Sequence, residues 1–160
     1  MAIEKVKQYF AQFGMADKVL EFDVSSATVE LAAQALGCEP ERIAKTLSFR
    51  SDDGCMIVVM AGDAKIDNKK FKQKFAMKAR MLSPEEVDTL VGHSIGGVCP
   101  FAINEDIPVY LDVSMRRFET VFPACGSSNS AIELTCDQLE EYSHSLEWVD
   151  ICKGWQGEAE

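Results

Sequence analysis

The segment from Val91 to Phe101 constrains this chain more than any other, because it places three glycines and a proline among eleven residues. Glycine lets a ligand or another main chain come close, and proline fixes φ and removes an N–H group. The residues concerned are Gly92, Gly96, Gly97 and Pro100. Taken alone, the segment is compatible with a tight structural turn or with a rigid loop that aims main-chain N–H groups at an oxyanion.

The composition indicates one globular domain that spans residues 1–160. Hydrophobic residues make up 47% and charged residues 26% of the chain, as in ordinary globular proteins. The longest apolar runs, such as residues 56–61, are too short to cross a bilayer, and residues 1–7 do not resemble a secretory signal. We therefore expect no membrane association and a cytoplasmic location.

The six cysteines do not indicate a metal site. None of them forms a Cys-x-x-Cys pair, and the chain has only two histidines. In a reducing compartment such thiols are most simply small buried hydrophobes. We expect neither a metal nor a cofactor.

Charge is distributed unevenly along the sequence. The net charge is −10, yet ten of the sixteen basic residues and only four acids lie between Arg42 and Arg80. A basic zone on an acidic body could orient a polyanion, although a solvated helix face explains the same pattern. Four of these cations fall on a helix expected near residues 68–75, namely Lys69, Lys70, Lys72 and Lys74.

Periodicity and turn signals predict alternating helices and strands. Helices are expected at residues 3–13, 28–37, 68–75, 83–92 and from 135 onward, with a helical turn at 114–118. Their start signals include Thr28, Ser83 and Thr135 as N-caps, the last two within capping boxes. Strands are expected at residues 18–22, 44–50, 55–61, 108–112, 120–122 and 131–134. A frayed tail is expected at residues 157–160.

Lys45 is unusual because it shares a strand face with apolar residues. Asp53-Gly54 joins strands 44–50 and 55–61 as an antiparallel hairpin. On the first strand, Lys45, Leu47 and Phe49 alternate with polar residues. A lysine in such company either extends its ammonium group to solvent or directs it into a cleft toward an anion.

Several motifs in a fixed order resemble the YbaK and prolyl-tRNA-synthetase-associated domain family of trans-editing aminoacyl-tRNA deacylases. The resemblance covers about residues 20–143. The motifs are an alanine-rich helix ending in Leu36-Gly37, the triplet Lys45-Thr46-Leu47, the turn Ala61-Gly62-Asp63, the loop Gly92–Pro100 and the turn Cys125-Gly126 before Ile132-Glu133-Leu134. Each motif is weak alone, but the ordered set is specific.

The resemblance implies an α+β domain with a twisted, mostly antiparallel or mixed barrel-like sheet flanked by helices. It implies hydrolysis of the ester in a mischarged aminoacyl-tRNA carrying a small amino acid such as alanine, cysteine or serine, with tRNA-Pro as one candidate. The partners would be the tRNA acceptor end and an aminoacyl-tRNA synthetase. By this resemblance the catalytic groups are Lys45, Gly96 and Gly97, and Pro100 and Gly126 shape the substrate-facing walls. His93, Ser94, Cys99 and Ser127 stand in the same two glycine segments and are also expected to bind the substrate, although His93 and Cys99 depart from the family pattern. The lysines of the basic helix are the candidate contacts to tRNA, namely Lys69, Lys70, Lys72 and Lys74.

Three alternatives remain open from the residues. A thiolate could form if His93 pairs with Cys99 or Cys125. The domain could bind tRNA or aminoacyl-adenosine as a regulatory module without turnover. A phosphate cradle is a weaker reading, because no Gly-x-x-x-x-Gly-Lys-Ser/Thr motif is present. The sequence does not define the oligomeric state.

Overall fold

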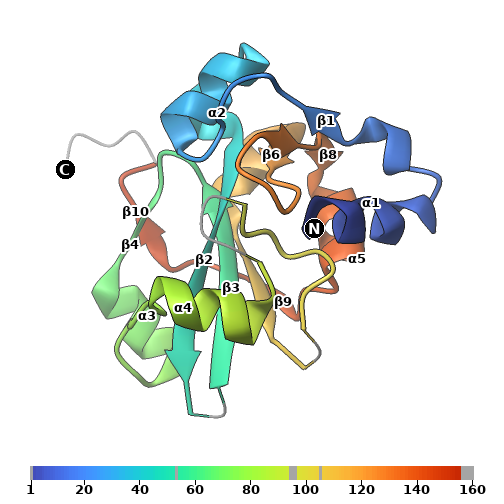
Figure 1. Ribbon diagram of the computed structural model, residues 1–160. Helices are drawn as coiled ribbons and strands as arrows, with labels where there is room; N and C mark the ends of the chain where they lie inside the picture. Colours follow the sequence, from blue (N-terminus) through green and yellow to red (C-terminus); the bar gives the residue numbers. More distant parts are fainter. Residues whose placement is uncertain (1, 53, 94–96, 105, 156–160) are drawn as a thin grey trace.

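A mixed sheet of six strands forms the centre of the molecule (Figure 1). The computed structural model describes residues 2–52, 54–93, 97–104 and 106–155. The strands follow the order β8 (Leu134–Thr135), β6 (Thr120–Pro123), β2 (Ile43–Ser51), β3 (Gly54–Ala61), β5 (Val109–Asp112) and β9 (Glu147–Val149). Pairs β6–β2, β3–β5 and β5–β9 are parallel, and the other two are antiparallel. This arrangement confirms the expected α+β fold with a mixed sheet.

The hairpin of β2 and β3 supplies the two longest strands, as the Asp-Gly signal predicted. Its register runs from Ser51 opposite Gly54 to Ala44 opposite Ala61. Every residue of β3 from Cys55 to Ala61 is buried, so this strand lies at the centre of the hydrophobic core. Strand β2 is more accessible in its middle, where Lys45, Thr46 and Leu47 are only half-buried. The exposed part of β2 is therefore where a ligand can reach the sheet.

Helices cover the sheet and begin where their caps predict. The longer ones are α1 (Ala2–Ala11), α2 (Val29–Leu36), α3 (Asn68–Phe75) and α5 (Cys136–Ser143). Thr28 caps α2, and Ser83 and Thr135 form the two expected capping boxes. The helix after Ser83 starts as α4 (Pro84–Glu86) and continues as the π-helical turn η3 (Val87–Val91), which ends at Gly92. Short 3₁₀ turns are η1 (Ala16–Lys18), η2 (Pro40–Arg42) and η4 (Val113–Arg117).

The prediction of one strand over residues 131–134 was wrong in its boundaries. This segment divides between β7 (Ser130–Ala131) and β8. Strand β7 pairs with β1 (Leu20–Glu21), whereas β8 pairs with β6. Two different partners cannot be met by one straight strand, so the chain turns between them.

The sequence analysis also missed three short strands, β4 (Lys65–Ile66), β9 and β10 (Cys152–Lys153). Strand β10 pairs with β4, and β9 extends the main sheet beside β5. A buried carboxylate, Asp112, accepts hydrogen bonds from the N–H groups of Ser114 and Ile151, both at 2.9 Å. This carboxylate fixes the end of the chain against β5, a long-range contact that carries no local signal.

The cysteines are all unpaired in the structure. Cys55, Cys99, Cys125 and Cys152 are buried, as expected for small hydrophobes. No helix among the described residues combines the length and the apolar character needed to cross a membrane.

Candidate active site

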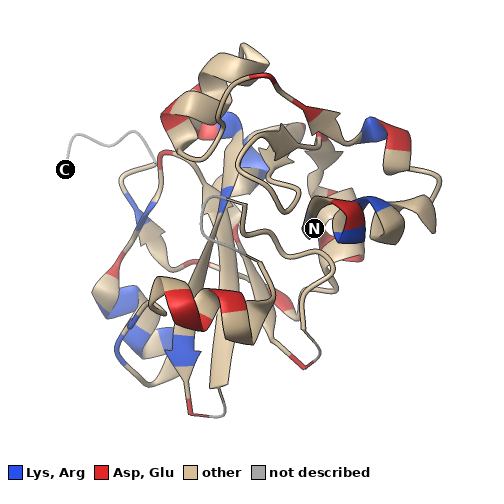
Figure 2. Cartoon of the chain, viewed as in Figure 1, with Lys and Arg blue, Asp and Glu red and all other residues tan. Residues whose placement is uncertain are grey.

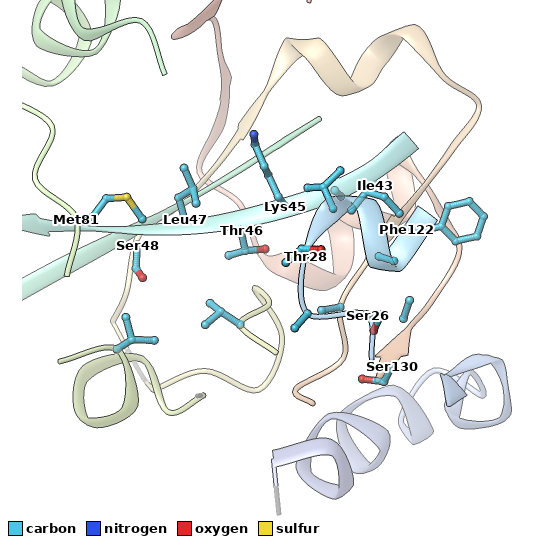
Figure 3. A pocket seen from close by; sticks show the side chains of 18 of the residues that line it. Ser26, Thr28, Ile43, Lys45, Thr46, Leu47, Ser48, Met81, Phe122 and Ser130 are labelled. Carbon is cyan, nitrogen blue, oxygen red and sulfur yellow. The ribbon is translucent and has the colours of Figure 1, made fainter. Parts of the chain in front are cut away.

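A pocket of about 340 Å³ lies along the middle of β2. Its walls come from the start of α2, from β2, from the segment around Met81, from η3 and from the β6–β7 region. The lining is mostly apolar, with Val29, Ile43, Val87, Val98 and Phe122 among its residues. The hydroxyl-bearing residues of the lining are Ser26, Thr28, Thr46, Ser48 and Ser130 (Figure 3). The size and the few polar groups fit a small-molecule site.

The pocket occupies a gap along the edge of β2 that faces away from β3, where β2 pairs with no other strand among the described residues. Pairing of β2 with β6 ends at Ala44 opposite Pro123. Further along, Leu82 N–H donates to Ser48 O at 3.2 Å, and Arg50 N–H donates to Arg80 O at 2.7 Å. Between Ala44 and Ser48, the main-chain edge of β2 that points away from β3 therefore faces the pocket.

Lys45 lies beside this gap, with Leu47, on the opposite face of β2 from Thr46 and Ser48 (Figure 3). Its Nζ donates a hydrogen bond to Gly62 O at 3.3 Å. Burial lowers the pKa of Lys45 below that of an ordinary lysine, and the neighbouring Cys152 and Asp63 oppose this shift. A partly desolvated cation at a pocket wall fits the cleft alternative of the sequence analysis.

The glycine loop and the second glycine turn meet in the structure. A Cβ added to Gly97 would lie 2.5 Å from Ser127 N and 2.6 Å from Gly126 C. No side chain fits at this distance, so Gly97 is required for the contact. Ser127 Oγ in turn donates to Ser130 Oγ at 2.8 Å, and Ser130 lines the pocket. The two predicted motifs thus support one wall, although Gly126 and Ser127 stand behind the lining. The predicted residues Ser94 and Gly96 lie outside the described residues.

His93, Cys99 and Pro100 are buried and are not among the described residues that line the pocket. His93 Nε2 is 2.7 Å from Phe101 O, which can only accept a hydrogen bond. Nε2 therefore carries the hydrogen atom and cannot act as a base for Cys99, whose Sγ is 3.6 Å away. The structure gives no support for direct substrate contact by these residues. Instead, they are buried beneath the glycine loop, where His93 and Cys99 contact Phe101 O.

The thiolate alternative does not fit this environment either. Burial raises the pKa of Cys99 to about 12 and raises that of Cys125 well above its usual value. Burial also lowers the pKa of His93, so an imidazolium that could stabilise a thiolate is disfavoured. Both thiols stay protonated and unreactive at neutral pH.

If the chain has the deacylase activity that the sequence resemblance implies, the double variant Cys99→Ala/Cys125→Ala should keep a rate within about threefold of the wild type, because neither cysteine is among the described residues that line the pocket. The fold should lose about 1–3 kcal/mol of unfolding free energy from the two small cavities. Single-turnover deacylation and chemical denaturation measure the two effects. A folded double variant without activity would restore a cysteine to the mechanism.

The four lysines of α3 do not form one uniform surface. Lys70 Nζ pairs with Asp150 Oδ1 at 3.2 Å, and Lys74 Nζ pairs with Glu147 Oε1 at 2.7 Å. Lys69 and Lys72 are exposed and have no side-chain partner in the part of the chain that the structure describes. Figure 2 shows Lys and Arg residues gathered on α3, whereas acidic residues lie on α4, the next helix along the chain. Lys70 and Lys74 therefore form ion pairs with β9 and with the segment that follows it.

Most of the pocket wall carries no signal in the sequence. Met81, Val87 and Phe122 come from different elements and meet only in the fold. Thr46 and Ser48 could be assigned to the polar face of β2, because they alternate with its apolar residues. Alternation alone does not show that other parts of the chain also cover this polar face and form a pocket there. Ser48 is only 4% exposed.

The chain combines a mixed sheet with a pocket beside a lysine-bearing central strand and a wall that requires glycine. A solved structure described as a candidate trans-editing enzyme for prolyl-tRNA synthetase has the same fold, which places the chain in the class of α+β editing domains. It superposes with a TM-score of 0.86 at 29% identity, covering 96% of this chain and 98% of that one.

The chain belongs to the aminoacyl-tRNA editing domain family, whose model matches residues 23–142. It is 57% identical over 157 residues to the uncharacterized protein YwhH of Bacillus subtilis, covering 98% of this chain and 100% of that protein. It is 28% identical over 114 residues to EbsC of Enterococcus faecalis, covering 70% of each chain. The name of EbsC describes it as a candidate Cys-tRNA(Pro)/Cys-tRNA(Cys) deacylase. These similarities confirm the family resemblance found in the sequence.

Proposed function

We propose that this protein is a trans-editing hydrolase that cleaves the ester between a small amino acid and the 3′-terminal adenosine of a mischarged tRNA. The observation that carries the proposal is the 340 Å³ pocket beside Lys45, in a chain of the editing-domain family. This volume is near the lower end for small-molecule sites, so it suits an aminoacyl group better than a whole nucleotide. Alanine, cysteine and serine are the candidate amino acids.

The reaction requires little from side chains, because an aminoacyl ester is already activated. A water molecule adds to the ester carbonyl carbon, the bond to the ribose oxygen breaks, and the proton of the water ends on that oxygen. Main-chain N–H groups of the glycine loop, around Gly96 and Gly97, would stabilise the oxyanion. The ribose hydroxyl next to the ester would help to place the water. Lys45 would supply positive charge for the terminal phosphate or the oxyanion.

Non-catalytic binding of the same ligand is the second candidate. It is favoured by one observation: among the described residues lining the pocket, Lys45 is the only one with an ionisable side chain. Turnover separates the two functions, because both predict binding.

The experiment is a deacylation panel with the purified wild-type protein. Alanyl-, cysteinyl-, seryl- and prolyl-tRNA-Pro are incubated with the protein, and the remaining ester is followed over time. We expect faster hydrolysis of at least one of the first three esters and protection of prolyl-tRNA-Pro. The names of EbsC and of the solved trans-editing structure make tRNA-Pro the first tRNA to test. Adding a prolyl-tRNA synthetase tests the proposed partner.

We also propose that α3 contacts the tRNA through Lys69 and Lys72, which have no side-chain partner among the residues that the structure describes. The double variant Lys69→Gln/Lys72→Gln should weaken tRNA binding and reduce the slope of log K against log salt by about 1.5–2, because two phosphate contacts are lost. The matched control is Lys70→Gln/Lys74→Gln, whose cations already pair with Asp150 and Glu147. Its salt slope should change less. Equal slopes for the wild type and the Lys69/Lys72 variant would remove α3 from the interface.

A further inference from the structure

The main chain of β2 presents unused hydrogen-bonding groups to the pocket. In an extended strand the N–H and C=O groups of alternate residues point to the same edge. Ser48 O and Arg50 N–H bond the Arg80–Leu82 segment, so the even-numbered residues of β2 direct their main chain away from β3. Thr46 follows the same rule, and its N–H and C=O point into the gap. Neither group has a main-chain partner among the described residues.

This open edge is closed at both ends. The β6 pairing reaches Ala44, and the bond from Leu82 N–H occupies Ser48 O. Four residues of strand span roughly 13 Å. A peptide that added a strand to this edge would collide with β6 on one side and with the Met81–Leu82 segment on the other. Of the three β2 residues between these ends, only Thr46 directs both its N–H and its C=O into the gap.

One residue opposite Thr46 can satisfy both groups. In an antiparallel pair, two opposed residues exchange two bonds, with each N–H donating to the other's C=O. An aminoacyl ester carries the same two functions, an α-amine and an ester carbonyl. It also ends after a single residue, which a peptide does not.

We propose that the open edge of β2 recognises the main-chain part of the aminoacyl group. The substrate α-amine donates to Thr46 O, and Thr46 N–H donates to the ester carbonyl oxygen. The carbonyl bond strengthens as that oxygen becomes an oxyanion, so Thr46 N–H adds to the donors of the glycine loop. The inference rests on the proposed deacylase function and names how that site holds its substrate.

The arrangement also separates the two ends of the substrate. Directly opposed residues place their side chains on the same face. The amino-acid side chain would therefore lie on the Thr46 face, and Lys45 would be left on the other face for the tRNA (Figure 3). Recognition through the main chain would let one pocket accept several small amino acids.

The first test changes the α-amine of the substrate. Three acyl-tRNAs are prepared that share the preferred side chain from the deacylation panel and carry an amine, a hydroxyl or only hydrogen at the α-carbon. For alanine these are alanyl-, lactyl- and propionyl-tRNA. The series is seryl-, glyceroyl- and 3-hydroxypropionyl-tRNA for serine, and cysteinyl-, 3-mercaptolactyl- and 3-mercaptopropionyl-tRNA for cysteine. The first two members of each series carry an α-donor, and the third lacks one. Each kcat/KM is divided by the spontaneous hydrolysis rate of the same ester, since the α-substituent also changes ester reactivity.

We expect the third member to lose roughly tenfold in normalised kcat/KM relative to the first two, because Thr46 O would be left unpaired. Equal normalised values across the series would overturn the inference while leaving the deacylase function intact. Absence of hydrolysis for every mischarged tRNA would instead overturn the proposed function itself.

The second test changes the protein. Replacing the Thr46 N–H by an ester oxygen in the main chain should lower kcat/KM by roughly tenfold, because one donor to the carbonyl is lost. The same replacement at Arg50 is the matched control. It removes the bond to Arg80 O, outside the gap, so it should lower the melting temperature without this loss of activity. A folded Thr46 ester protein with wild-type kcat/KM would contradict the inferred role of the N–H.

Discussion

Lys45→Ala is expected to lower kcat/KM for deacylation about 100-fold or more, because the substrate loses the one charged side chain that the described pocket lining offers to its terminal phosphate or its oxyanion. The fold should persist, because the Lys45 side chain donates one hydrogen bond within the described residues, to Gly62 O, and its charge is already partly desolvated. Single-turnover hydrolysis of the preferred mischarged tRNA measures the loss, and the melting temperature reports the fold. Lys65→Ala is the matched control, since Lys65 is exposed and does not line the pocket.

The pH dependence provides a second readout of the same residue. Lys45 must be charged in this account, and burial lowers the pKa of its ammonium group. Activity corrected for spontaneous hydrolysis should therefore fall, as pH rises, earlier than it would with an ordinary lysine. Lys45→Arg should retain some activity and lose this alkaline fall, because arginine stays charged. A folded Lys45→Ala protein with near-normal turnover would remove Lys45 from the mechanism.

The second large effect is expected for Gly97→Ala. The new methyl group would meet main-chain atoms of Gly126 and Ser127 at 2.5–2.8 Å, and main chain cannot move aside as a flexible side chain can. We expect a loss of about 1–3 kcal/mol in unfolding free energy from overpacking, together with at least tenfold lower activity. Thermal melting and single-turnover deacylation measure the two effects.

Gly14→Ala separates this steric effect from the ordinary cost of replacing a glycine. Gly14 has φ of +71°, and a Cβ there would meet nothing within 4 Å. That variant should lose about 1–2 kcal/mol from the left-handed conformation alone and keep its activity. If Gly97→Ala is as active as Gly14→Ala, the contact between the two glycine segments does not shape the site.

Local signals predicted the elements that local forces determine. The Asp-Gly turn fixed the β2–β3 hairpin, and Ser83 and Thr135 form the capping boxes that their spacing indicates. The strands that were missed or misplaced are two or three residues long. Their pairing depends on partners far along the chain, and so few residues show no period.

The site was predictable only in part, for a similar reason. The ordered motifs brought Lys45, Gly97 and Gly126 into one region, and the structure places them around or behind one pocket. His93 and Cys99 were expected at the substrate because they stand inside the glycine loop. Their burial follows from packing against Phe101 and the core, which a loop motif does not reveal.

The open edge of β2 shows the limit most clearly. Thr46 takes part through its main chain, and a main chain is identical at every non-proline position of a sequence. Its availability depends on where β6 stops and where the Met81–Leu82 segment begins. Only the three-dimensional register shows this gap.

The central claim is that this pocket hydrolyses mischarged aminoacyl-tRNA. The most direct measurement is the release of amino acid from alanyl-, cysteinyl- and seryl-tRNA-Pro by the wild type, with Lys45→Ala alongside and prolyl-tRNA-Pro as the cognate control. We expect that the wild type cleaves at least one mischarged ester, that Lys45→Ala loses most of this activity, and that the prolyl ester survives. Folded wild-type protein that binds these tRNAs and leaves every ester at its spontaneous rate would contradict it.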